Sequence, residues 1–108
     1  MQEKETVYLA GKISGDPYFW MKFNKAQREL EEAGYIVLNP ANQPQGLSYE
    51  AYIRMSRAMQ DECQAVCFLP DWTESNGAHG EYGRAVAKGQ TIFFYEEWKR
   101  IHDEAARA

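Results

Sequence analysis

Strand-like and helix-like segments alternate along this chain. Four short runs rich in apolar and β-branched residues fit β-strands, at residues 6–9, 35–38, 65–69 and 91–95. Each run is followed by a stretch in which apolar residues recur with helical spacing, and the connections are short. Alternation of this kind predicts parallel strands joined by right-handed crossovers, with helices on both faces. We therefore expect an α/β fold: a small doubly wound, flavodoxin-like or Rossmann-like parallel sheet with strand order 2-1-3-4.

Residues typical of helix ends mark where the helices begin and stop. Ser48 can cap the second helix, and Gly34 and Gly89 are placed to end the first and third helices. The third helix is expected to begin near Gly77, and an amphipathic helix closes the chain. The fourth strand is a continuous apolar run, which is typical of a strand buried within a parallel sheet.

Composition narrows the class of protein. The 108 residues are too few for two independent cores, so residues 1–108 are expected to form a single domain. With 12 basic and 16 acidic residues the net charge is −4, and the lack of a basic stripe argues against a nucleic-acid polymer as partner. The longest apolar run, residues 65–69, is far too short to span a membrane, and no signal peptide is visible. A cytoplasmic protein without membrane contact is expected.

Cysteine and histidine are too scarce for a persuasive metal site. Cys63 and Cys67 are the only cysteines, and His79 and His102 are the only histidines. A C-x3-C pair with so few other ligands does not make a zinc site, so we expect two small buried residues in a reducing compartment. Neither a metal nor a cofactor is expected.

The predicted topology selects two loops as the ligand site. In doubly wound sheets, ligands bind beyond the carboxyl ends of the strands, between strands 1 and 3, which here means residues 11–16 and 70–77. The first loop has two glycines with Lys12 and Ser14 between them, a composition that brings N–H groups and donors close to an anion. The same residues also fit an ordinary strand-to-helix turn.

The second loop leads into the third helix. Ser75 and Gly77 lie where this helix begins, so free N–H groups and the positive end of the helix dipole face the crevice. Glu81 follows one turn later, among small residues that tilt it toward the packed side of the helix. We expect the helix N-terminus to keep Glu81 ionised. A solvated surface glutamate is the alternative.

Two segments together resemble the nucleoside 2-deoxyribosyltransferase superfamily: Tyr8-Leu-Ala-Gly-Lys-Ile-Ser-Gly15 and Ser75-Asn-Gly-Ala-His-Gly-Glu-Tyr-Gly83. Within it, the chain most resembles short phage and bacterial domains of unassigned function. These share the Asn39-Pro40 turn, the segment Gly46-Leu-Ser-Tyr-Glu and the run Leu69-Pro-x-Trp72. The resemblance extends from residue 7 to about residue 95.

The resemblance implies cleavage or exchange of an N-glycosidic bond by a hydrolase or transferase. Glu81 matches the nucleophile, and Tyr8 matches the tyrosine that orients its carboxylate. The residues that match the phosphate-holding positions of the monophosphate branch are Gly11, Lys12, Ile13, Ser14, Gly15, Ser75 and Gly77. Transferases acting on free nucleosides usually carry aspartate where this chain has Ser75, which favours a nucleoside 5′-monophosphate as the small-molecule substrate. Relatives often carry a further aspartate on the second helix, at the position of Ser56.

Residue chemistry agrees with these roles. A carboxylate beside an oxocarbenium-like centre follows the logic of retaining glycosidases. Asp71 is the nearest candidate to protonate the leaving base, and Trp72 either stacks on the base or covers the end of the sheet. A non-catalytic nucleotide-binding module on the same scaffold remains the alternative.

We also expect a homo-oligomer. The crevice of so small a domain would be shallow, and the resembled family closes its site with a neighbouring subunit. Aromatic residues beside the first two helices fit such an interface, namely Tyr18, Trp20, Tyr49 and Tyr52.

Overall fold

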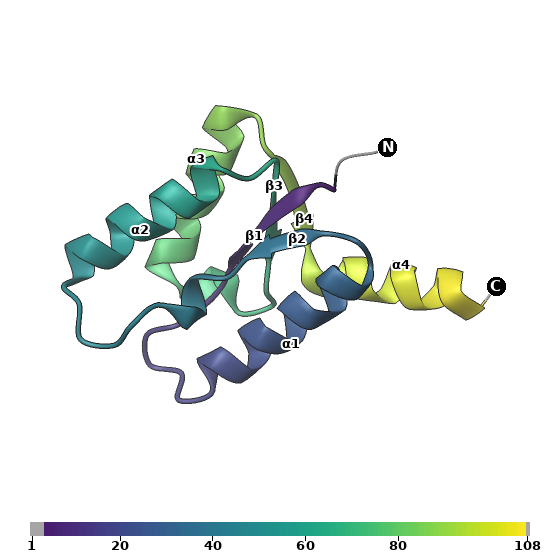
Figure 1. Cartoon of the computed structure of the whole chain (residues 1–108), viewed down its shortest axis with the longest axis horizontal. Helices are drawn as coiled ribbons and strands as arrows, with labels where there is room; N and C mark the ends of the chain where they lie inside the picture. Colours follow the sequence, from purple (N-terminus) through teal and green to yellow (C-terminus); the bar gives the residue numbers. More distant parts are fainter. Residues whose placement is uncertain (1–3, 108) are drawn as a thin grey trace.

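The computed structural model describes residues 4–107 as one parallel sheet of four strands, in the order β2-β1-β3-β4 (Figure 1). The strands are β1 (Thr6–Ala10), β2 (Ile36–Leu38), β3 (Ala65–Phe68) and β4 (Thr91–Phe94). The helices that follow them are α1 (Phe19–Glu32), α2 (Tyr49–Asp61), α3 (Asn76–Lys88) and α4 (Tyr95–Arg107). Two short 3₁₀ segments, η1 (Pro40–Asn42) and η2 (Trp72–Glu74), lie in the loops. The predicted α/β fold and strand order are confirmed.

Local signals place the helix ends as predicted. The Ser48 hydroxyl accepts a hydrogen bond from the Ala51 N–H at 3.1 Å, which caps the start of α2. Gly89 follows α3 with φ +69°, a left-handed conformation that glycine adopts without strain and that ends the helix. Gly34 ends the turn after α1 with φ +105° for the same reason.

Alternate residues of the strands build two cores, one on each face of the sheet. On the first face, residues of β1 and β3 pack against α1, with α4 beside it; the fully buried members include Val7, Leu9, Phe23, Leu30 and Cys67. On the second face they pack against α2 and α3, with Tyr8, Val66, Phe68 and Ala85 buried. Burial raises the pKa of both cysteine thiols to about 12, so Cys63 and Cys67 are protonated small core residues.

The fourth strand and the last helix depart from the prediction. β4 is an edge strand, and Phe94 on it is 36% exposed. The buried strand expected from its apolar sequence is wrong, because the sheet order gives β4 a neighbour on one side only. Tyr95 already belongs to α4, which leaves the sheet directly (Figure 1) and is held by a 2.7 Å hydrogen bond from the Tyr95 hydroxyl to Glu29 on α1. No helix within residues 4–107 is long and apolar enough to cross a membrane.

Candidate functional site

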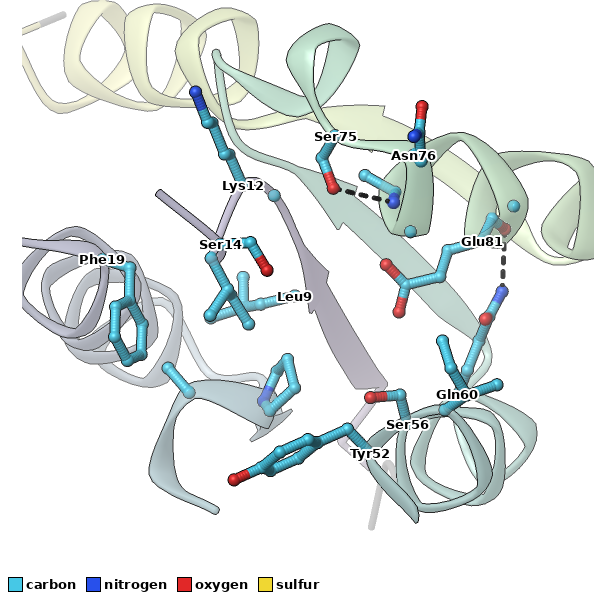
Figure 2. Close-up of a pocket in the computed structure, with 18 of the residues that line it drawn as sticks. Leu9, Lys12, Ser14, Phe19, Tyr52, Ser56, Gln60, Ser75, Asn76 and Glu81 are labelled. Atoms are coloured by element: carbon cyan, nitrogen blue, oxygen red, sulfur yellow. Dashed lines mark hydrogen bonds between the residues drawn. The ribbon is translucent and has the colours of Figure 1, made fainter. Parts of the chain in front are cut away.

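A cleft of about 810 Å³ opens at the carboxyl end of the sheet (Figure 2). The loop after β1 borders it on one side, α2 and the η1 segment on another, and the start of α3 on a third. This volume lies within the range that accommodates small-molecule ligands. The crevice expected to be shallow thus has room for a ligand, and α2 supplies one of its walls.

Glu81 and Tyr8 meet inside this cleft. Glu81 projects its carboxylate from α3 into the cleft, and the Tyr8 hydroxyl on β1 donates a hydrogen bond to Glu81 Oε2. Tyr8 is 1% exposed, so its ring is fixed within the core while its hydroxyl reaches the cleft. The two residues predicted to act together are thus brought together by β1 and α3.

Burial dominates the charge state of this pair. It raises the pKa of Glu81 to about 7, although the hydrogen bond from Tyr8 acts in the opposite direction. Burial also raises the pKa of Tyr8 well above its usual value, with the charge of Glu81 adding to the effect. The helix N-terminus was expected to help keep Glu81 ionised, but burial is the larger effect on its pKa. Glu81 lies beyond the first turn of α3, where the dipole is weak, and loss of water outweighs it.

The start of α3 offers hydrogen-bond donors to the same cleft. Ser75 caps the helix, since its hydroxyl accepts a hydrogen bond from the Ala78 N–H at 3.1 Å. The N–H groups of Asn76 and Gly77, in the first turn, have no acceptor within the helix. Both residues line the cleft, as does Ser14 on the opposite loop. This end of the cleft can therefore hold an anion.

The glycine-bearing loop lines the cleft only in part. Gly11, Lys12, Ile13 and Ser14 border it, whereas Gly15 lies in the turn outside the lining, with φ +81°. The prediction that Gly15 contacts the ligand is not supported by this placement, because its backbone turns the chain toward α1.

Packing alone gives a reason for glycine at position 11. A Cβ at Gly11 would lie 3.0 Å from the Leu69 Cβ and 3.2 Å from Phe23 Cζ. The ends of β1 and β3 and the helix α1 therefore leave little room for a side chain at this position, whether or not a ligand binds.

Asp71 lies beside the cleft, and each of its carboxylate oxygens has a partner. Its Oδ1 accepts a hydrogen bond from the Lys12 N–H at 3.1 Å, and its Oδ2 pairs with the ammonium group of Lys22 on α1. It is not part of the cleft lining. The role of Asp71 as the acid for the leaving base stays a prediction. In this structure the carboxylate joins the loops after β1 and β3 to each other and to α1.

Trp72 also lies outside the cleft lining. Its ring stacks on Tyr82, with centroids 5.2 Å apart and an interplanar angle of 13°, and packs 5.0 Å from the ring of Phe68. Of the two predicted roles, the structure supports the cover over the end of the sheet. Stacking on a base stays a prediction, and in this structure the 3₁₀ segment turns the ring toward α3 and β4.

The chain matches, over residues 5–94, the model of the family described as Domain of unknown function (DUF4406). It belongs to this family. A search of curated proteins finds no match for it. The matched segment contains all four strands and every residue of the cleft, whereas α4 lies beyond it.

A polar stripe on α2 completes the site of this DUF4406 domain. Tyr52, Ser56 and Gln60, spaced four residues apart, face the cleft (Figure 2). Sequence reasoning placed Ser56 by resemblance and did not identify Gln60. The four-residue spacing of polar side chains is a signal that could have identified this face.

Charged groups at the rim complete the lining. Arg57 from α2 and Arg84 from α3 lie on this rim with Glu74. Within residues 4–107 of the DUF4406 domain, no group of three His, Cys, Asp or Glu side chains is close enough to hold a metal ion.

Proposed function

We propose that this DUF4406 domain is a nucleotide N-glycosidase or deoxyribosyltransferase, which cleaves the N-glycosidic bond of a (deoxy)nucleoside 5′-monophosphate. The observation that carries the proposal is the buried Glu81 carboxylate, held by Tyr8, in the same cleft as the free N–H groups of α3. The resemblance to the nucleoside 2-deoxyribosyltransferase superfamily, centred on these residues, supports it.

In the proposed reaction, Glu81 acts as the nucleophile. Because Tyr8 holds Oε2, the other oxygen is free to attack the anomeric carbon. The bond between this carbon and the base nitrogen breaks with its electron pair on the base, which takes a proton from water. A water molecule then attacks the same carbon, the electron pair of the ester bond returns to Glu81, and the proton of the water passes to solvent. In a transferase, a second base replaces this water.

The spacing along α3 supports a monophosphate. Gly77 and Glu81 are four residues apart, or roughly 6 Å along a helix at 1.5 Å per residue. A pentose can bridge this span, with its 5′-phosphate at the N–H groups of Asn76 and Gly77 and its anomeric carbon at Glu81. The reaction needs no metal or cofactor, since a carboxylate supplies the nucleophile. A nucleotide substrate also favours a cytoplasmic location.

A homo-oligomer remains part of the proposal. Tyr18 and Tyr49 are each 67% exposed and Trp20 is 52% exposed, which supports an interface beside α1 and α2. Tyr52 differs from the expectation: it is half-buried, and its hydroxyl donates to the Pro44 carbonyl at 2.5 Å. Light scattering on the full chain tests this part, and a monomeric mass would contradict it.

The decisive experiment is base release from a panel of nucleosides and 5′-monophosphates, followed by chromatography. We expect wild-type protein to release base from a monophosphate, with a rate that rises with pH through about 7 as Glu81 ionises. Glu81→Ala should lower this rate at least 100-fold, or about 2.7 kcal/mol of barrier. Nucleotide binding should persist, because the phosphate contacts other residues.

A non-catalytic nucleotide-binding module is the second candidate. The engagement of Asp71 by Lys22 favours it, because the cleft then lacks an acid for the leaving base other than Glu74 at the rim. If the wild-type chain binds a monophosphate tightly and releases no base from any member of the panel, this second function is correct.

A further inference from the structure

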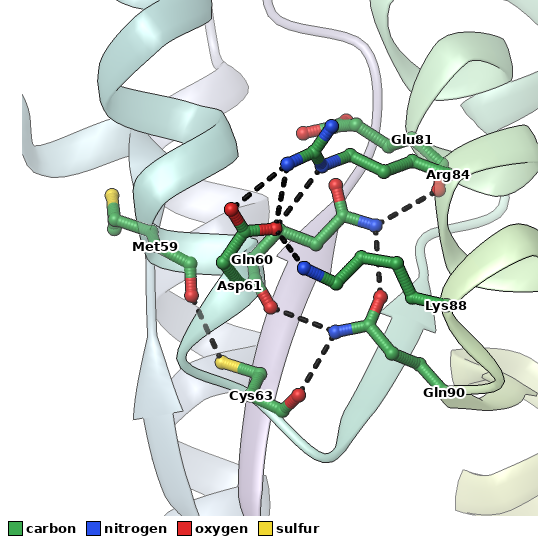
Figure 3. A network of polar contacts seen from close by, with 8 residues as sticks. All are labelled: Met59, Gln60, Asp61, Cys63, Glu81, Arg84, Lys88 and Gln90. Atoms are coloured by element: carbon green, nitrogen blue, oxygen red, sulfur yellow. Dashed lines mark hydrogen bonds and ion pairs between the residues drawn. The ribbon is translucent and has the colours of Figure 1, made fainter.

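Gln60 forms a bridge beneath the cleft, from the last turn of α2 to α3 (Figure 3). The side chain is 0% exposed, and its Nε2 donates to the backbone carbonyl of Glu81 at 3.0 Å and to Gln90 Oε1 at 3.1 Å. Gln90 in turn donates to the backbone carbonyls of Gln60, at 2.7 Å, and Cys63, at 2.8 Å. Because each donor faces a carbonyl acceptor, the orientation of both amides is determined.

A second connection between the same two helices lies at the surface. The Asp61 carboxylate accepts hydrogen bonds from Arg84 at 2.8 Å and from Lys88 at 2.6 Å (Figure 3). These ion pairs are exposed, and they contact α3 one and two turns beyond Glu81. Gln60 differs from Asp61 because it contacts the residue that carries the candidate nucleophile.

Gln60 is the deepest contact of α2 with the interior, next to the partly buried Met59. Gln60 is the one fully buried residue of α2, whereas the rest of the helix is half-buried or exposed. Its Oε1 is buried without a hydrogen-bond partner among the described residues. An apolar side chain of the same size would fill this position without burying an unpaired oxygen. Packing alone therefore does not explain a glutamine here.

We propose that Gln60 is a positioning residue for Glu81: its amide fixes the turn of α3 that carries Glu81, so that the carboxylate stays against the Tyr8 hydroxyl inside the cleft. Glu81 is then held at two points, by its backbone carbonyl from α2 and by its carboxylate from β1. The consequence for catalysis rests on the proposed function, whereas the positioning itself can be measured without any substrate.

The test compares Gln60→Met with a control that removes the surface connection, the double variant Asp61→Asn/Lys88→Met. The double variant removes one negative and one positive charge, so the net charge is unchanged. The readout is the titration of the Glu81 carboxyl, followed by carbon-13 NMR on the full chain. In Gln60→Met we expect the Glu81 pKa to fall from about 7 by one unit or more, because a loosened turn admits water to the carboxylate. The control should shift it by less than about half a unit.

Equal shifts in the two variants, or no shift in Gln60→Met, would overturn the positioning role. If Gln60→Met does not fold, as judged by circular dichroism, Gln90→Met takes its place. This variant leaves Gln60 without the amide that orients it, so a smaller fall of the Glu81 pKa is expected, and an unchanged value contradicts the proposal.

Base release supplies a second readout. If wild-type protein cleaves a monophosphate, Gln60→Met should lower kcat about 10- to 100-fold with little change in KM, as expected for a misplaced reacting group. A raised KM with unchanged kcat would count against positioning. If the wild-type chain releases no base, the proposed function fails, and the titration still decides the role of Gln60.

Discussion

On one face of the sheet, Val7 and Leu9 of β1 pack against Phe23 and Leu30 of α1 in a closed apolar core. On the opposite face, Tyr8 of the same strand directs its hydroxyl to a carboxylate within an open cleft. The side chains that β1 directs to either face are almost fully buried, whereas Glu81 at the cleft is half-buried. The two faces therefore differ in the chemistry of the groups that β1 contacts.

This difference shows how the domain can tolerate a buried acid. Removing a carboxyl from water is unfavourable, and the raised pKa of Glu81 reflects this. The apolar core on the α1 face can offset the loss. We expect substitutions on the α1 face to change stability, and substitutions on the cleft face to change chemistry.

The largest stability effect is expected from Phe23→Ala. Phe23 is fully buried on the α1 face, and truncation of a buried phenylalanine costs about 3–5 kcal/mol. Urea unfolding measures this loss. Base release per folded molecule should not change. A loss below about 1 kcal/mol would mean that the α1 face is not the main source of stability.

A pH-dependent effect is expected from Glu81→Gln on the cleft face. The pKa of Glu81 is about 7 in the folded protein and lower in the unfolded chain, so the wild type loses stability as pH rises from about 4.5 to about 7. Glutamine does not ionise, so the Glu81→Gln variant does not lose stability over this pH range. Urea unfolding should show equal stabilities at pH 4 and a variant more stable by about 1–3 kcal/mol at pH 8. If the unfolding free energies of wild type and variant change in parallel with pH, burial of the Glu81 carboxylate has no cost in stability.

An effect of similar size is expected on the α1 face from Gly11→Ala. The new Cβ would press on Leu69 and Phe23, and overpacking of this kind costs about 1–3 kcal/mol. Gly83→Ala is the matched control: a Cβ there meets nothing within 4 Å, and alanine favours a helix by up to about 1 kcal/mol. Thermal melts of both variants would separate them. Equal melting temperatures would refute the packing role of Gly11.

The smallest effect is expected from Asp71→Asn. The ion pair with Lys22 is partly exposed, so its loss should cost no more than about 1 kcal/mol. Base release should stay within about twofold of the wild type, because Asp71 lies outside the cleft. A loss of 100-fold or more in kcat would instead restore Asp71 as the acid.

The fold was predictable because its local signals agree with one another. Ser48 and Ser75 cap helices, Gly89 ends one, and the alternation of strands and helices leaves few topologies. Tyr8 and Glu81 could be predicted as a pair only through the resemblance to a known family. The topology by itself selects the loops between the first and third strands, whereas Tyr8 lies within β1.

Other features depend on tertiary contacts that no short segment encodes. Gln60 looks like a surface residue of α2, and its burial depends on Gln90, which lies 30 residues later. Asp71 follows the right strand for a catalytic acid, but Lys22 on a distant helix engages it. The exposure of β4 follows from its place at the edge of the sheet, which the apolar sequence of the strand does not reveal by itself.

The N–H groups of Asn76 and Gly77 at the start of α3 carry no net charge. Dissolved ions screen exposed charges over about 10 Å at 0.1 M salt, and they weaken contacts made by lysine and arginine more than short hydrogen bonds in a cleft. An anion held mainly by these peptide groups would stay bound as ionic strength rises. Under the proposed function, competition would come instead from other anions of similar shape, so assays of nucleotide binding are best made in buffers free of phosphate and sulfate.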